Sequence, residues 1–171
     1  MVVKELDGRA LEVLGRVRRA VRLVVESEVM RRDLLDEVAN QVVLPQQRWE
    51  IARLLRVQSE LRAEQARARS GVVTAELETV LGPQEEALRV SERALGERVA
   101  RLEEYAARVR IADAALRARD ALGRNEKYVE LLAMTDDVEG VRGLSAGAAE
   151  LAALLTESVR EAVVAGRALR G

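Results

Sequence analysis

Residues 83–122 read PQEEALRVSERALGERVARLEEYAARVRIADAALRARDAL, and an apolar residue recurs in this stretch at every seventh position. These positions hold Leu88, Leu95, Leu102, Val109 and Leu116. A seven-residue apolar repeat places one stripe along one side of an α-helix, and such a stripe has to be buried against other helices. The stretch therefore predicts a helix on the order of 60 Å long, around which the rest of the chain packs.

The residues that flank this stretch are ones that end and start helices. Gly82 suits the left-handed position just past a helix end, and Pro83 suits the first turn of the next helix. Gly123 predicts the end of the helix. The predicted helix therefore occupies residues 83–122.

The apolar stripe is a candidate surface for contacts between helices. Both seam positions of the heptad are apolar only over residues 95–109; outside this range the second position is acidic, at Glu92, Asp113 and Asp120. A parallel two-stranded coiled coil usually has β-branched residues at one seam position and leucine at the other, so this pattern favours an antiparallel bundle. The predicted interaction seam comprises Leu88, Leu95, Val99, Leu102, Val109 and Leu116.

The other face of this stretch alternates in charge. An acid precedes a base by four residues in four places, which is the spacing of stabilising ion pairs on a helix surface. The arginines could form a site for a polyanion, but the interleaved acids favour a solvated and self-neutralised face. The four pairs are Glu85–Arg89, Glu97–Arg101, Glu104–Arg108 and Asp113–Arg117.

The composition argues against several kinds of chemistry. The 171 residues include 28 basic and 29 acidic side chains, and cysteine, histidine and phenylalanine are absent. A near-zero net charge with no basic patch argues against nucleic-acid binding. The missing cysteine and histidine remove thiol chemistry, the usual general base and the commonest ligand of transition metals. We therefore expect no catalytic site, no cofactor and no metal site, and a core of leucine, valine and alanine.

Neither a membrane span nor a signal peptide is predicted. No run of about 18 apolar residues occurs, and the first residues lack the layout of a signal peptide. We therefore expect a cytoplasmic protein.

Residues 2–44 carry an apolar stripe at helical spacing and predict the first long helix. The stripe is interrupted at Ser27, Glu28 and Arg31. A basic run on this helix could lie on an anionic membrane surface, although flanking acids favour a solvated face. The run consists of Arg16, Arg18, Arg19 and Arg22.

Pro45 predicts the first break, because proline disfavours a helical residue before it and suits the start of a helix. A second helix is predicted over residues 45–81, with Gln58 and Gln65 in its apolar stripe. The two glutamines form either a buried polar layer that fixes register or the edge of a narrow seam, and we favour the edge. Whether Ser70-Gly71 kinks this helix is open.

Trp49 is the single tryptophan and lies near the start of the second predicted helix. An aromatic side chain there either covers the end of a bundle or anchors a partner. We favour the first interpretation and keep Trp49 as a candidate partner anchor.

The long helices are joined by short connections, which make consecutive helices antiparallel neighbours. The predicted fold class is all-α, an elongated antiparallel bundle of three long helices. These helices occupy residues 2–44, 45–81 and 83–122.

The last third of the chain adds two more predicted helices. A short helix is predicted over residues 125–134 and a C-terminal helix over residues 146–169. We predict a single domain with a three-helix core of residues 1–122 and a C-terminal extension of residues 123–171. Whether the last helix packs on its own bundle or on a neighbouring copy is open.

The function predicted from these features is that of a non-enzymatic helical scaffold or adaptor. It would act through helix–helix contacts with protein partners or with itself, as a homo-oligomer. One alternative is a peripheral membrane protein that uses the basic N-terminal helix. A second is a carboxylate-only hydrolase dependent on magnesium or manganese, for which the four-apart acid pairs are candidates. Those pairs are Glu60 with Glu64 and Glu126 with Glu130.

Overall fold

The structure is a computed structural model that describes residues 6–135, 137–145 and 147–170. Every regular element in these residues is helical, which confirms the all-α prediction. The elements are α1 (Gly8–Val25), α2 (Glu28–Arg31), α3 (Glu37–Arg69), α4 (Ala75–Leu122), α5 (Asn125–Ala133), α6 (Val138–Ser145), α7 (Ala148–Arg167) and the 3₁₀ turn η2 (Ala168–Arg170).

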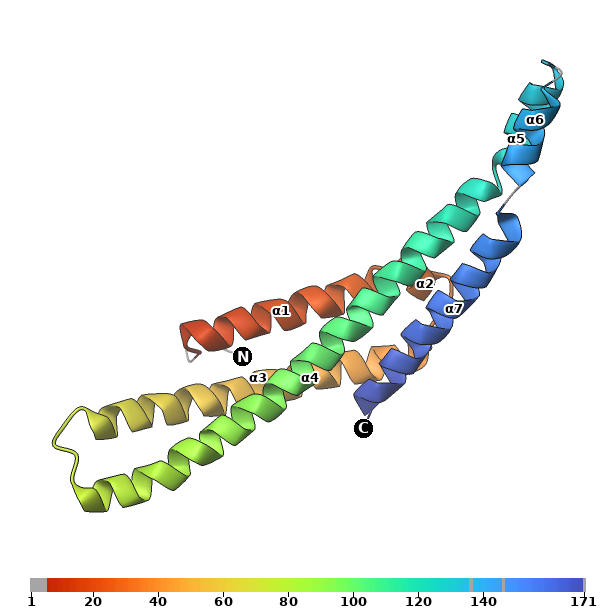
Figure 1. Ribbon diagram of the computed structural model, residues 1–171. Helices are drawn as coiled ribbons and strands as arrows, with labels where there is room; N and C mark the ends of the chain where they lie inside the picture. The colour runs from red at the N-terminus through yellow and green to blue at the C-terminus, as the bar shows by residue number, and fades with distance from the viewer. Residues whose placement is uncertain (1–5, 136, 146, 171) are drawn as a thin grey trace.

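α4 is the central rod, and α1, α3 and α7 pack along it (Figure 1). Ion pairs and other contacts fix the directions of these helices. Arg9 meets Glu92 and Arg16 meets Glu103, so α1 runs in the same direction as α4. Glu50 meets Arg98 and Gln58 meets Ser91, so α3 runs against α4. Glu161 meets Arg108 and Gly166 lies at Tyr105, so α7 also runs against α4. The long helices α1, α3 and α4, which follow one another in the chain, therefore alternate in direction, as predicted. α7 is a fourth member of the bundle.

Figure 1 shows that the molecule is elongated and that its two ends differ. At one end the α3–α4 connection extends beyond the start of α1 and the end of α7. At the other end α5 and α6 pair with each other beyond the end of α4. Asn125 links this pair, because its Nδ2 donates to the Leu144 carbonyl at 2.8 Å.

The predicted first helix over residues 2–44 is wrong as a single element. The chain breaks between α1 and α3, where the sequence stripe is interrupted. Ser27 caps α2 by accepting a hydrogen bond from the Met30 N–H, and Asp33 lies in the left-handed region at φ 56°. Asp36 then caps α3. The break is therefore set by these local capping side chains. Residues 2–5 of the predicted helix lie outside the described residues.

Both prolines lie inside helices, so the predicted boundaries at Pro45 and Pro83 are also wrong. The helix continues through each proline because the preceding turn is held by burial. Leu44 is fully buried before Pro45, and Leu81 is buried two residues before Pro83. Gly82, directly before Pro83, has no Cβ to clash with the proline ring.

The true connection between the second and third long helices is at residues 70–74. α3 ends at Ser70, so Ser70-Gly71 is a terminus rather than a kink. Thr74 caps α4 by accepting a hydrogen bond from the Leu77 N–H at 3.3 Å. The far end of α4 is as predicted, with Gly123 at its C-cap.

The C-terminal third is close to the prediction. The short helix is α5, and the last helix is α7, extended by η2. α7 packs along α4 of the same chain, which answers the question that the sequence left open. α6 was not predicted, and residue 146, the first of the predicted last helix, is not described.

Candidate helix-binding trough

All six residues of the predicted interaction seam are buried within the chain. Their exposed fractions fall from 7% at Leu88 to 0% at Val109 and Leu116. The heptad stripe is thus used for the contacts of α4 with helices of its own chain. A surface for partners has to be sought elsewhere.

We call the part of the molecule where α1, α3 and α7 surround α4 the body. Its centre is Tyr105, which is 1% exposed. Its hydroxyl accepts a hydrogen bond from Asn40 Nδ2 at 2.8 Å. Gly166 of α7 lies so close that a Cβ at this position would be 3.0 Å from the ring. Burial raises the pKa of the Tyr105 phenol. Three helices are therefore tightly packed at one place, where Tyr105 of α4 meets Asn40 of α3 and Gly166 of α7.

The basic run on α1 does not form one continuous surface. Arg16 is held by a two-point contact with Glu103, at 2.8 and 2.6 Å, and this contact lowers the pKa of Glu103. Arg18, Arg19 and Arg22 are exposed. The apolar stripe of α1 faces the core, where Val17 and Val24 are fully buried, so it is not free to enter a lipid surface.

Trp49 does not cover the end of the bundle. It lies within α3 and is 56% exposed, and the Arg53 guanidinium lies 5.7 Å from its ring centroid. The interpretation favoured from the sequence is therefore wrong. Trp49 remains an exposed aromatic side chain on the outer surface of α3.

Gln58 and Gln65, the two glutamines of the predicted apolar stripe, differ in burial. Gln58 is 3% exposed and its Nε2 donates to the Ser91 hydroxyl of α4 at 2.9 Å. It is thus a buried polar link, and the edge interpretation is wrong for it. Gln65 is only partly buried.

The acid–base pairs predicted along α4 are mostly replaced by contacts with other helices. Among the described residues only Glu104 and Arg108 form their predicted pair, at 3.8 Å. Glu85 instead contacts Arg69, and Asp113 accepts a hydrogen bond from the Val29 N–H. These two carboxylates thus connect α4 to α3 and α2 and do not form ion pairs within α4.

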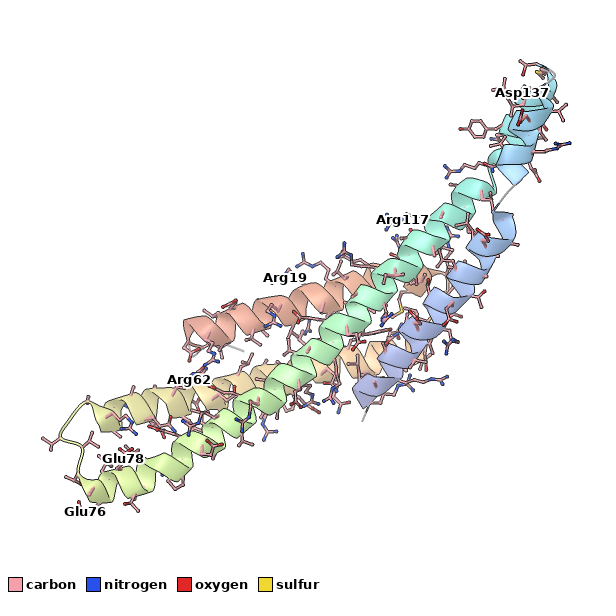
Figure 2. The ribbon with its side chains drawn as sticks, viewed as in Figure 1. Arg19, Arg62, Glu76, Glu78, Arg117 and Asp137 are labelled. Carbon is pink, nitrogen blue, oxygen red and sulfur yellow. The ribbon has the colours of Figure 1, made fainter. Side chains whose placement is uncertain are left out.

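We call residues 54–69 of α3 and 75–91 of α4 the hairpin. Its border with the body is an ionic cluster around Arg62, which contacts Asp7 at 2.7 Å and Glu92 at 2.5 Å (Figure 2). The hydrogen bond from Arg62 holds the pKa of Asp7 below its usual range. Past this cluster, α1 no longer accompanies the hairpin (Figure 1).

The side of the hairpin that faces α1 is closed by charge. Arg69 lies seven residues after Arg62, so the two arginines share one face of α3. Arg69 contacts Glu85 at 2.5 Å and Glu78 at 3.1 Å. The ion pairs of Arg62 and Arg69 therefore cover the side of the hairpin that faces α1 with charged groups, which water can also solvate.

The opposite side of the hairpin is an apolar trough. It encloses about 470 Å³ between α3 and α4. Leu54, Val57 and Leu61 line it and are 37%, 44% and 41% exposed. Its remaining lining is mostly small, amide or leucine side chains: Gln58, Gln65, Ala68, Leu81, Gln84, Ala87, Leu88 and Ser91, with Glu64 the one acid.

The trough continues towards the C-terminus of the chain. A second hollow shares Leu54 and Ser91 with it and reaches Leu169 of η2, whose carbonyl accepts a hydrogen bond from Gln47 at 2.9 Å. Arg98 and Arg101 line this end. The trough is thus the empty continuation of the groove between α3 and α4 in which the chain's own last turn lies.

Comparisons with protein-family models, with curated proteins and with solved structures found no match. Within the described ranges, no three acidic side chains gather as a metal ion would require. In the same part of the chain, no helix is long and apolar enough to cross a bilayer.

The trough was not predicted from the sequence, although the sequence contains a signal for it. Leu54, Leu61 and Ala68 are seven apart on α3, which repeats the heptad signal of α4. A stripe of this kind predicts burial but does not say which helices cover it. Only the structure shows that α1 and α7 stop short of this part of the hairpin.

Proposed function

We propose that this chain is a non-enzymatic helical scaffold or adaptor that acts through helix–helix contacts made in the trough. One observation carries the proposal. The hairpin has one face sealed by ionic contacts of Arg62 and Arg69 and the other left apolar. An end of a bundle that only faced water would gain nothing from leaving leucine and valine side chains on one side.

The shape of the trough fits a helix. Residues 54–68 of α3 extend for about 20 Å, which is the length of about four helical turns. A helix that lies in a groove between two helices is a common mode of protein recognition. Gln65 and Gln84 in the lining can hydrogen-bond to an occupant without the desolvation cost of a charge.

Site-specific crosslinking in cells tests this proposal. A photoreactive amino acid replaces Leu61 in the trough, and in a matched control it replaces Ile111, which is 49% exposed on α4 in the body. We expect a discrete crosslinked protein adduct from position 61 and none from position 111. The same adducts from both positions, or none from position 61, would contradict a partner-binding role of the trough.

A further inference from the structure

We infer that the trough binds a second copy of this chain, whose own hairpin packs on it face to face and antiparallel. The two hairpins then form a four-helix bundle. This inference rests on the proposed function, because it names the partner of the same trough. It is carried by the charge pattern along the trough and by the area that the hairpin offers.

The two ends of the trough carry opposite charge. Near the 70–74 connection, Glu64 lines the trough, and Glu76 lies about two helical turns before the lining residue Gln84 on α4. At the other end lie Arg98 and Arg101. One end is therefore acidic and the other basic.

Several of these charges are left without a counter-ion. Glu64, Glu76 and Arg101 form no ion pair with any residue that the structure describes, although the Glu76 carboxylate is hydrogen-bonded to Thr74 and to its own backbone. Arg98, in contrast, is held by Glu50 and Gln47. The trough thus offers an acid at one end and a base at the other to an incoming partner.

A second copy complements this pattern in only one of the two symmetric arrangements. A two-fold axis parallel to the helices would place the acidic ends together. A two-fold axis perpendicular to the helices, near Leu88, reverses the direction of the second hairpin. In this arrangement the acidic end of each copy lies on the basic end of the other. Glu76 lies twelve residues before Leu88 and Arg101 thirteen after it, so the two side chains come level in this arrangement. By symmetry the contact is made twice.

The area of the contact indicates whether the dimer is permanent or reversible. Two helices about 20 Å long and about 10 Å wide each present roughly 400 Å² per copy. The total is about 800 Å², which is below the size of stable interfaces and fits a weak, reversible one. We expect half-dimerisation between about 1 and 100 µM.

Light scattering on the purified full-length chain, coupled to size exclusion over a concentration series, tests the inference. We expect the mass to rise from one chain to two. Leu61→Glu buries a charge twice in the dimer, so we expect it to weaken dimerisation by more than about a hundredfold. Ile111→Glu is the matched control, and we expect it to dimerise like the wild type. Circular dichroism verifies that both variants stay helical.

A charge exchange tests the orientation. Glu76→Arg and Arg101→Glu should each weaken dimerisation by about tenfold, because each puts like charges together at two places. The double variant Glu76→Arg/Arg101→Glu should restore the wild-type dissociation constant. Additive weakening in the double variant would overturn the antiparallel arrangement.

A wild-type chain that stays monomeric up to about 500 µM would overturn the inference. Crosslinking then separates the two proposals. Adducts from position 61 to another protein, together with a monomeric mass, would leave the proposed function standing and remove the second copy. If the chain is monomeric and position 61 gives no adducts, both the proposed function and the second copy are ruled out.

Discussion

The two halves of α4 are built from the same heptad but have different surroundings. In the body, where α1, α3 and α7 surround it, Val99 and Leu102 are each 1% exposed and Val109 is fully buried. In the hairpin α4 lies against α3, and Leu81 and Leu88 keep 4% and 7% exposure outside the central core cluster. The comparison teaches that a heptad stripe predicts burial but does not say what buries it. The lengths of the neighbouring helices decide how much of the stripe is covered by the same chain.

The largest expected effect separates a body leucine from a trough leucine. Leu102→Ala leaves a cavity in the body and should lower the free energy of unfolding by about 2–5 kcal/mol. Leu61→Ala removes a side chain that is 41% exposed and should cost less than about 1 kcal/mol in the monomer. Urea unfolding at low protein concentration, followed by circular dichroism, measures both. Equal losses would mean that the hairpin is as well packed as the body.

A smaller effect tests the point where the body helices meet. Tyr105→Phe removes the oxygen acceptor of the buried Asn40 amide, which then keeps only the weak Met30 sulfur acceptor at 3.8 Å, and should lower the free energy of unfolding by about 1–2 kcal/mol. The control is Tyr128→Phe, at a tyrosine that is 57% exposed, and it should have no measurable effect. The same unfolding assay applies.

The same tyrosine makes the body sensitive to alkali. Burial raises the pKa of Tyr105 in the folded chain, so the folded chain holds its proton more tightly than the unfolded chain does. This contribution is complete below the ordinary tyrosine pKa near 10 and is lost as the pH rises through the raised value. Tyr105→Phe should therefore flatten the alkaline limb of a stability–pH profile. An unchanged limb would show that Tyr105 does not titrate with unfolding.

The hairpin has its own test at Pro83. Pro83→Ala restores a helical N–H in α4 and should stabilise the chain by about 1 kcal/mol, because proline is unfavourable inside a helix. Thermal unfolding measures the gain. A loss of stability would mean that the local geometry at Pro83 is needed for the hairpin.

The smallest effect lies at the border between the two halves. Arg62→Gln removes the partner of Asp7 and Glu92 and should cost less than about 1 kcal/mol near neutral pH. The lowered pKa of Asp7 means that this contribution is present above the ordinary aspartate pKa and is lost as the pH falls through the lowered value. The difference between variant and wild type should thus shrink below about pH 4. A difference that is constant with pH would contradict the ionic role of Arg62.

The sequence predicts the fold class because the apolar period is long and regular. The buried seam from Leu88 to Leu116 and the end of α4 at Gly123 could be read directly from spacing. The helix starts could not, because Pro45 and Pro83 resemble start signals, whereas the side chains of Asp36 and Thr74 cap the actual starts of α3 and α4. A capping side chain satisfies free N–H groups at a helix start, whereas a proline only tolerates that position.

The candidate site was beyond the sequence for a different physical reason. The trough exists because α1 begins and α7 ends where the α3–α4 pair continues (Figure 1). This depends on how helices of unequal length align, which is set by long-range contacts such as Arg62–Glu92. Spacing within one helix contains no information about that alignment, so the sequence identified the stripe and not its open end.

Hydrogen exchange along α4 tests the central claim, which is that the body is closed by its own chain and the hairpin is completed by a second copy. At low protein concentration we expect slow exchange for residues 95–116 and faster exchange for residues 76–91. At high concentration protection should rise in residues 76–91 and 54–68 and stay unchanged in residues 95–116. Uniform protection along α4 that does not depend on concentration would contradict the account.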